Sequence, residues 1–213
     1  MREWLSSSKP IAVLSRLTGV SAFLLLTVVF FARPIAISLL PLYRALFELI
    51  TSDYRILFLG LSFEGADSVI RLDVTLSHAI AVEGHLVMAN PQGMATVTTM
   101  LGNIFQPAMV GLVAILTWPS PSSHNLILRL GILILLCLIE SVLDIPLLLS
   151  GELWGIFLDN LSPGHWSALT AWADFLQGGG RFALGLTVAI FSIASANYAS
   201  SCIADKRWEI RLK

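Results

Sequence analysis

The chain contains 213 residues, of which 56% are hydrophobic and 13% are charged, and its formal net charge at pH 7 is −1. Soluble domains carry about 25% charged residues, so this composition excludes an ordinary water-exposed surface and indicates a membrane protein. The nearly balanced charge also excludes the basic field that nucleic-acid binding requires, and no nucleic-acid partner is expected.

Four apolar segments are long enough to cross a membrane as helices, since a span needs roughly 20 mostly apolar residues. They cover residues 17–40, 96–118, 126–149 and 182–203. We therefore expect an α-helical membrane protein with four transmembrane helices, surrounded by membrane lipids. The first helix is expected to continue along the interface to residue 50, because apolar residues recur there with helical spacing.

The predicted order of parts follows from these spans and from the polarity of the segments between them. It comprises a cytoplasmic N-terminus (1–16), a first helix with its interfacial extension (17–50), an extracytoplasmic β segment (51–95), the second and third helices (96–149), an outer loop with short helices (150–180), and a fourth helix with a basic cytoplasmic tail (181–213).

The distribution of arginine and lysine predicts the orientation in the membrane. Basic residues flank the first and last predicted spans, at Arg2, Lys9, Arg16, Lys206, Arg207, Arg211 and Lys213. The two long segments between spans carry more acidic than basic residues. Both termini are therefore expected in the cytoplasm, with the chain in a bacterial inner membrane. Arg129 is expected to extend toward the cytoplasmic face from the third helix.

The segment 51–95 is predicted to form a small antiparallel sheet. Residues 70–77 alternate between apolar and polar side chains, a period of two that is typical of a half-buried strand. Further strand candidates lie at 55–63 and 80–88, and residues 64–67 (Glu-Gly-Ala-Asp) predict a turn. Three strands with one apolar face would form a meander.

Tryptophans mark the predicted outer loop, 150–180. Trp154, Trp166 and Trp172 are spread through it, and Trp118 ends the second predicted helix. Tryptophan favours the membrane–water boundary, where its ring lies in an apolar region and its N–H stays hydrated. We expect these four residues to be interfacial anchors, with two short helices of the loop lying on the outer leaflet.

Glu140 and Asp144 form the most informative polar pair, because they lie four residues apart on the third predicted helix and share one face. Arg181 opens the fourth helix at the same predicted level. Ionisable groups at membrane depth are costly and face protein or water. Two interpretations follow: a proton or cation site or acid/base pair, or a structural ion pair of Arg181 with Asp144 or Glu140. The structural interpretation is favoured, and Pro146 is expected to kink or end the third helix.

No catalytic set, cofactor or metal site is predicted. Cys137 and Cys202 show no CxxC spacing and no nearby histidine, so they indicate neither a disulfide framework nor a metal centre. The four histidines are scattered, and the serines that precede His78 and His124 do not by their adjacency define a nucleophile–base pair.

The order of parts resembles that of the small membrane proteins encoded beside exosortases, the bacterial enzymes that process C-terminal sorting tails. The resemblance rests on the Asn90-Pro91 entry to ANPQGMATVTTMLGNIFQP, the region of Trp154, and Gly180-Arg181 in GGGRFALGL. It covers most of the chain in layout only. It implies a companion protein and not the enzyme, because the Cys, Arg and His set of an exosortase has no counterpart around Cys137 or Cys202.

These patterns favour a non-enzymatic accessory or scaffold subunit that binds other integral membrane subunits of a larger complex. The alternative is a membrane enzyme or small transporter that uses Glu140, Asp144 and Arg181. Charge-neutral substitutions at Glu140 and Asp144 separate the two, since loss of turnover with intact assembly favours the alternative.

Overall fold

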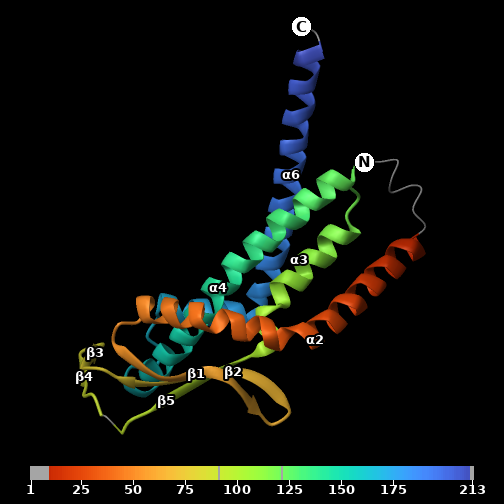
Figure 1. The fold of residues 1–213 in the computed structure, drawn as a ribbon. Helices are drawn as coiled ribbons and strands as arrows, with labels where there is room; N and C mark the ends of the chain where they lie inside the picture. The colour runs from red at the N-terminus through yellow and green to blue at the C-terminus, as the bar shows by residue number, and fades with distance from the viewer. Residues whose placement is uncertain (1–9, 91, 121, 212–213) are drawn as a thin grey trace. The chain divides into compact units, whose positions relative to one another are not determined.

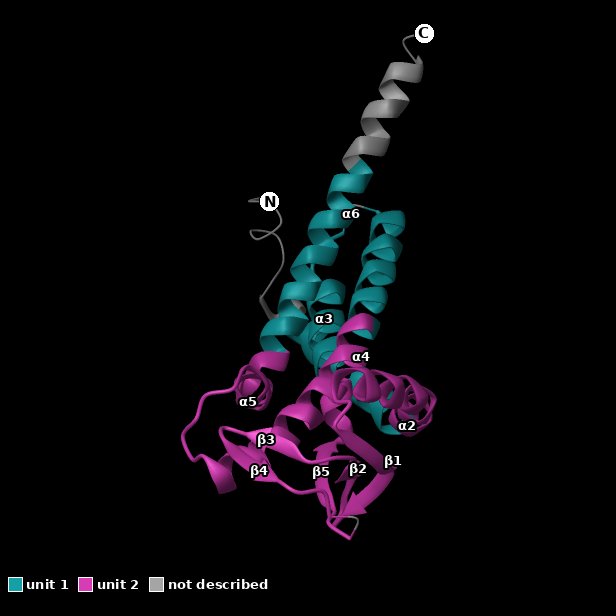
Figure 2. Cartoon of the chain, turned by 90° about the vertical axis from the view of Figure 1, so that its left-hand side faces the viewer, with its two compact units in different colours: residues 1–30, 106–138, 182–213 teal, residues 31–105, 139–181 magenta. Residues whose placement is uncertain are grey.

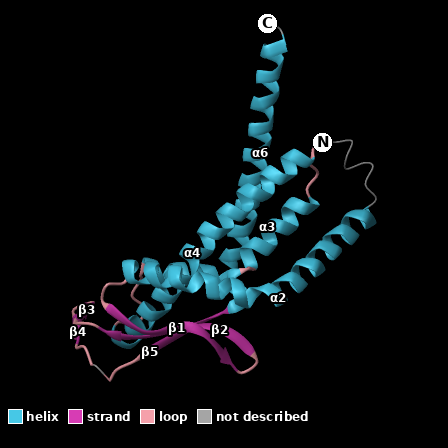
Figure 3. Ribbon diagram, in the orientation of Figure 1, coloured by secondary structure: helices cyan, strands magenta, loops and turns pink. Residues whose placement is uncertain are grey.

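The computed structural model describes residues 10–90, 92–120 and 122–211, and the side chains of 14–90, 92–120 and 122–200. The described chain is mostly helical and includes two small sheets (Figure 1 and Figure 3). The helical elements are α2 (Pro10–Ile50), η1 (Leu101–Ile104), α3 (Gln106–Thr117), α4 (Ser123–Leu161), α5 (Ala168–Phe175), η2 (Leu176–Gly180) and α6 (Arg181–Arg211). The strands are β1 (Tyr54–Glu64), β2 (Asp67–Leu76), β3 (Ile80–Val82), β4 (His85–Val87) and β5 (Ala95–Met100). Of the basic residues used to predict orientation, Arg2, Lys9 and Lys213 lie outside the described residues, as do the side chains of Lys206, Arg207 and Arg211.

Three helical stretches are long and apolar enough to cross a membrane: Leu14–Ile50, Ser123–Leu161 and Ala168–Ser200. They confirm the prediction of a mainly helical chain with long apolar helices that could span a membrane. A fourth span is not confirmed, because α3 has 12 residues. At about 1.5 Å per residue it is about 18 Å long, against a hydrocarbon core of about 30 Å.

The prediction of one helix over 96–118 is wrong in its first half, where the chain forms the strand β5 and the short 3-10 helix η1. The six residues of β5 are ATVTTM, and their β-branched side chains favour a strand. The β segment therefore extends to residue 100. Helix α3 begins at Gln106 with Pro107 in its first turn, where a missing N–H costs no hydrogen bond.

Pro146 neither ends nor interrupts α4, which continues as one helix to Leu161. Prolines are tolerated inside membrane helices because neighbouring groups satisfy the freed backbone. Consequently Trp154 lies on α4, and only the second predicted short helix of the outer loop forms separately, as α5. The stop comes at Ser162-Pro163-Gly164, where Gly164 takes a φ of 83° that ends the helical path.

The chain divides into two compact units, each built from separated segments (Figure 2). Unit 1 comprises residues 1–30, 106–138 and 182–213, and unit 2 comprises 31–105 and 139–181. In unit 1, Ile115, Leu133 and Ala189 form a buried core between α3, α4 and α6.

Small residues allow the helices of unit 1 to approach closely, as is common between membrane helices. A Cβ atom added at Gly185 would lie 2.6 Å from the carbonyl oxygen of Pro107. One added at Gly111 would lie 2.7 Å from a methyl group of Leu133. The backbone of α6 therefore packs against that of α3 at a distance that only glycine permits.

In unit 2, a three-stranded antiparallel sheet has the order β1-β2-β5. The alternation over 70–77 is confirmed, because Ile70, Leu72 and Val74 are completely buried on one face of β2. The predicted turn at 64–67 is also confirmed, since Glu64 pairs with Asp67 and Gly65 adopts a φ of 63°. Figure 1 and Figure 2 show the second half of α2 along one side of this sheet.

The third predicted strand does not join that sheet. Residues 80–88 instead form their own hairpin, β3–β4, closed by Glu83 and Gly84 with φ of 47° and 85°. Two successive positive φ values define the tight turn that matches the twist of a hairpin. Ile80 and Val82 pack on Leu158 near the end of α4.

Candidate functional site

The predicted polar residues Glu140, Asp144 and Arg181 all lie in unit 2, and the structure joins two of them. Arg181 Nε lies 2.9 Å from Asp144 Oδ2, and the two side chains are 2% and 4% exposed. Of the two ion pairs that the sequence left open, the one with Asp144 forms. The pair ties the start of α6 to α4.

A kink that depends on glycine places Arg181 next to Asp144. Gly179 adopts a φ of 108°, which side-chain-bearing residues rarely take. A Cβ atom at Gly180 would lie 2.5 Å from the carbonyl oxygen of Phe175. The glycines at 178–180 therefore allow the backbone to turn before α6, and this turn places the Arg181 guanidinium beside α4.

Several polar atoms of this group have no hydrogen-bond partner among the described residues. They are both carboxylate oxygens of Glu140, Oδ1 of Asp144 and Nη2 of Arg181, and all are buried. An unsatisfied buried polar atom costs about 1–3 kcal/mol, and more when charged. Arg181 and Asp144 thus share a single hydrogen bond. One donor of Arg181, one acceptor of Asp144 and two acceptors of Glu140 have no partner among the described residues.

Two further contacts surround this group inside unit 2. The hydroxyls of Tyr43 and Ser141 lie 3.0 Å apart and connect α2 to α4 next to Glu140. Gln177 Nε2 donates to Glu152 Oε1 at 2.6 Å. The candidate site is therefore held by α2, α4, η2 and α6 together.

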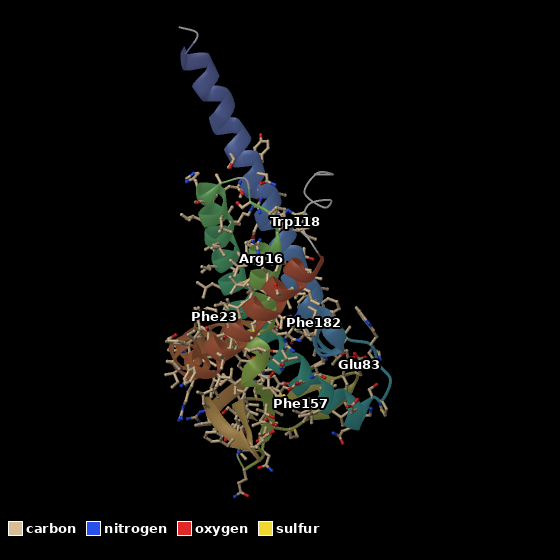
Figure 4. The ribbon with its side chains drawn as sticks, turned by 90° about the vertical axis from the view of Figure 1, so that its right-hand side faces the viewer. Arg16, Phe23, Glu83, Trp118, Phe157 and Phe182 are labelled. Atoms are coloured by element: carbon tan, nitrogen blue, oxygen red, sulfur yellow. The ribbon has the colours of Figure 1, made fainter. Side chains whose placement is uncertain are left out.

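The tryptophans predicted as interfacial anchors fall into two groups. Trp118, just beyond α3, and Trp166 are exposed, by 46% and 75%. Trp118 is labelled in Figure 4. Trp154 packs against the β3–β4 hairpin. Trp172 lies with its ring 5.4 Å from that of Phe175, and its Nε1 is buried without a hydrogen-bond partner among the described residues.

Arg129, which was expected to extend toward the cytoplasmic face, is 1% exposed inside unit 1, and that expectation stays a prediction. Its guanidinium donates to the carbonyl oxygen of Pro119 at 3.1 Å and to Asn197 Oδ1 at 3.0 Å. Asn125, one turn earlier on α4, donates to the carbonyl oxygen of Ala196. The sequence signal for this network was the pair of polar residues four apart on an apolar helix, 125 and 129.

The structure also places Ser77, His78 and Asp53 in hydrogen-bond contact. Ser77 Oγ lies 3.0 Å from His78 Nδ1, and His78 Nε2 lies 3.0 Å from Asp53 Oδ1. However, Ser77 Oγ also donates to the backbone carbonyl of Asp53 at 2.8 Å, and all three residues are substantially exposed. The geometry fastens the end of β2 to the turn before β1 and supplies no activated nucleophile.

Two cavities lie in unit 2. The larger, about 550 Å³, lies between the end of α4 and α5 and is lined by Glu152, Asp159, Asp174 and His165, among others. The smaller, about 270 Å³, lies between the sheet, β4 and the end of α4. Across the part of the chain that the structure describes, no group of three or more His, Cys, Asp or Glu side chains is placed to hold a metal ion.

The chain matches no protein-family model, and no curated protein sequence or solved structure is detectably similar to it.

Proposed function

We propose that this chain is a non-enzymatic accessory or scaffold subunit of a larger complex in a bacterial inner membrane. In this proposal α3 crosses as a short fourth span, so both termini lie in the cytoplasm and the sheet of unit 2 lies on the opposite side. The three apolar helical stretches support membrane insertion. The partner is another integral membrane subunit with an extended segment facing the same side.

One observation carries this proposal: β1 is an edge strand with large exposed apolar side chains. In the order β1-β2-β5, one edge of β1 has no neighbouring strand among the described residues. Phe58 and Phe63 are 45% and 64% exposed on this strand. An edge of this kind is a template for another chain, and soluble proteins protect such edges with charges or short strands. Addition of a partner strand would pair the backbone and cover the aromatic rings.

The experiment is co-purification in mild detergent from the cells that make the protein. Wild type and Leu86→Lys are expected to retain a stoichiometric partner, whereas Phe63→Lys is expected to lose it. Leu86 is the matched control, because it is an equally exposed apolar residue on β4. Recovery of the wild type only as a free monomer would count against the proposal.

The layout resemblance noted above makes an exosortase-type protein-sorting enzyme one partner to test first. The proposal does not depend on that identity, since any integral subunit that offers an extended strand satisfies the same geometry.

A second candidate function is a membrane enzyme or small transporter that uses Glu140, Asp144 and Arg181. The observation that favours it is Glu140, whose two buried carboxylate oxygens have no partner among the described residues. Proton-driven and cation-driven proteins place such carboxylates at membrane depth. Proteoliposomes with a pH-sensitive dye would test it: Glu140→Gln should abolish ion movement, and Glu64→Gln, an exposed change at the β1–β2 turn, should not. Unchanged ion movement in Glu140→Gln would exclude this role.

A further inference from the structure

The smaller cavity of unit 2 combines an apolar wall with one buried, unused hydrogen-bond donor. Its volume is about 270 Å³, and its walls include Val87, Met88 and Met94 on one side and Ile156 and Phe157 of α4 on the other. Phe157 is labelled in Figure 4. Ligand pockets in proteins span roughly 300–1,000 Å³, so this cavity suits a small ligand or one chain of a larger one.

Tyr54 supplies the donor. Its side chain is 9% exposed and lines the cavity, with its ring 6.1 Å from that of Phe157. Its hydroxyl is buried and has no hydrogen-bond partner among the described residues. Buried tyrosine hydroxyls are normally bonded, so this one is a donor that a carbonyl oxygen of a bound molecule could satisfy.

We propose that this cavity binds the acyl chain of an uncharged amphiphile, with the Tyr54 hydroxyl donating to a carbonyl oxygen of that molecule. This proposal goes beyond the scaffold function and is independent of it.

The residues that line the cavity favour an uncharged ligand over a charged one. Among the described residues no Asp, Glu, Lys, Arg or His lines the cavity, so an anion would enter without a counter-charge. Burial, and secondarily the Asp53 carboxylate, raise the pKa of Tyr54 to about 12. The same negative field would repel a carboxylate placed at the hydroxyl, whereas an ester or acylglycerol carbonyl accepts a hydrogen bond without this penalty.

The walls favour a flexible chain over a rigid ring system. Met88 and Met94 are unbranched and exposed at 69% and 58%, so they can adjust around a flexible guest. The opposite wall consists of Ile156 and Phe157 of α4, whose side chains are both apolar. An acyl chain matches both surfaces, and its transfer from water is worth about 0.8 kcal/mol per buried CH₂.

The experiment uses the full chain in phosphatidylcholine nanodiscs with monodecanoylglycerol that carries a diazirine at the end of its chain. After irradiation, mass spectrometry of peptides maps the labelled sites. Labelling is expected on the peptides that contain Met88, Met94 or Phe157, and unlabelled monodecanoylglycerol is expected to compete. Sodium decanoate at pH 8 is expected to compete poorly.

Two variants test the assigned atoms. Tyr54→Phe removes only the hydroxyl and is expected to reduce labelling about fivefold. Ala95→Leu adds bulk to a residue that lines the cavity and is expected to abolish labelling, while Ala81→Leu, the same change at an exposed position on β3, is expected to leave it unchanged. Thermal unfolding shows that each variant is folded.

Three outcomes would overturn the proposal. They are labelling confined to the helices of unit 1, labelling of Met88 and Met94 that survives in a folded Ala95→Leu variant, and competition by decanoate equal to that by the neutral ester. Competition by an apolar peptide but not by monodecanoylglycerol would also overturn it and assign the cavity to a protein partner. Because partner recovery through Phe63 is measured separately, failure here leaves the scaffold function standing.

Discussion

Arg181 Nε lies 2.9 Å from Asp144 Oδ2 in a setting where both side chains are almost completely buried. This contact joins residues 37 positions apart in the chain and fixes the start of α6 on α4 within unit 2. Such a pair gains little net stability over an apolar pair, because both charges lose their hydration. Loss of one partner is different, since it leaves the other charge buried alone.

We therefore expect Arg181→Leu to destabilise the protein by about 3–5 kcal/mol. The double variant Arg181→Leu/Asp144→Leu should recover most of that loss, because neither charge remains. Arg44→Leu is the control: it removes the Arg44–Glu48 pair, which is 3.0 Å long but more than half exposed, and should cost less than about 1 kcal/mol. Unfolding in detergent measures all three, and equal losses for Arg181→Leu and Arg44→Leu would contradict the structural role.

Glu140→Leu should stabilise the protein by about 1–3 kcal/mol, because it removes two buried acceptors that have no partner among the described residues. Thermal unfolding of the variant beside wild type in the same detergent checks this. A gain in stability together with a loss of ion movement would assign Glu140 to function. A loss of stability would show that the carboxylate has a partner in the membrane.

Gly185→Ala should destabilise unit 1 by about 1–3 kcal/mol, because its new methyl group would meet the Pro107 carbonyl at 2.6 Å. The matched change is Gly131→Ala on α4, where nothing lies within 4 Å of the added carbon. That variant should be neutral or more stable by up to about 1 kcal/mol, because alanine favours the helix. Equal effects of the two substitutions would contradict the close approach of α6 to α3.

The Asp73 carboxylate, which lies outside the membrane-spanning helices, should make the stability of the protein depend on pH. Burial alone would raise its pKa, but Arg71 Nε and Thr96 Oγ1 both donate to Oδ1 at 2.8 Å, and the net effect lowers the pKa below its ordinary value of 3.8. A carboxyl whose pKa is lower in the folded state stabilises fully above the unfolded value and loses that contribution as the pH falls through the folded value.

Asp73→Asn should therefore lower stability by about 1 kcal/mol at pH 7, and the difference from wild type should shrink as the pH falls below about 4. Melting temperatures of both proteins between pH 7 and pH 3 measure this. Asp67→Asn, at the exposed β1–β2 turn, is the control. It should change neither the stability at pH 7 nor the way in which stability varies with pH. A difference that grows on acidification would contradict the assigned hydrogen bonds.

The sequence predicted what depends on local pattern. The long apolar runs at 17–40 and 126–149 lie within stretches that can span a membrane, and the alternation at 70–77 falls on a strand up to Leu76. The failure came at 96–118, where hydropathy is high but does not distinguish a buried strand from the start of a helix. Pairing with β2 decides that segment, and such pairing is a long-range event.

In the candidate site, too, local spacing predicts part of the arrangement and tertiary packing decides the rest. The helical spacing of Glu140 and Asp144 placed both on one face, but only the tertiary position of Arg181 selects Asp144 as its partner. Tyr54 was not predicted as a site residue, because its burial beside Phe157 depends on tertiary packing and has no sequence signature.

The interleaved segments of the two units have a consequence for synthesis. Unit 1 needs residues from three separated segments, and unit 2 is completed by Arg181. A ribosome must therefore have passed Arg181 before the Asp144–Arg181 bond can form. Truncation at any point within α4 would leave both halves unfinished, so neither unit is expected to be obtainable as a contiguous fragment.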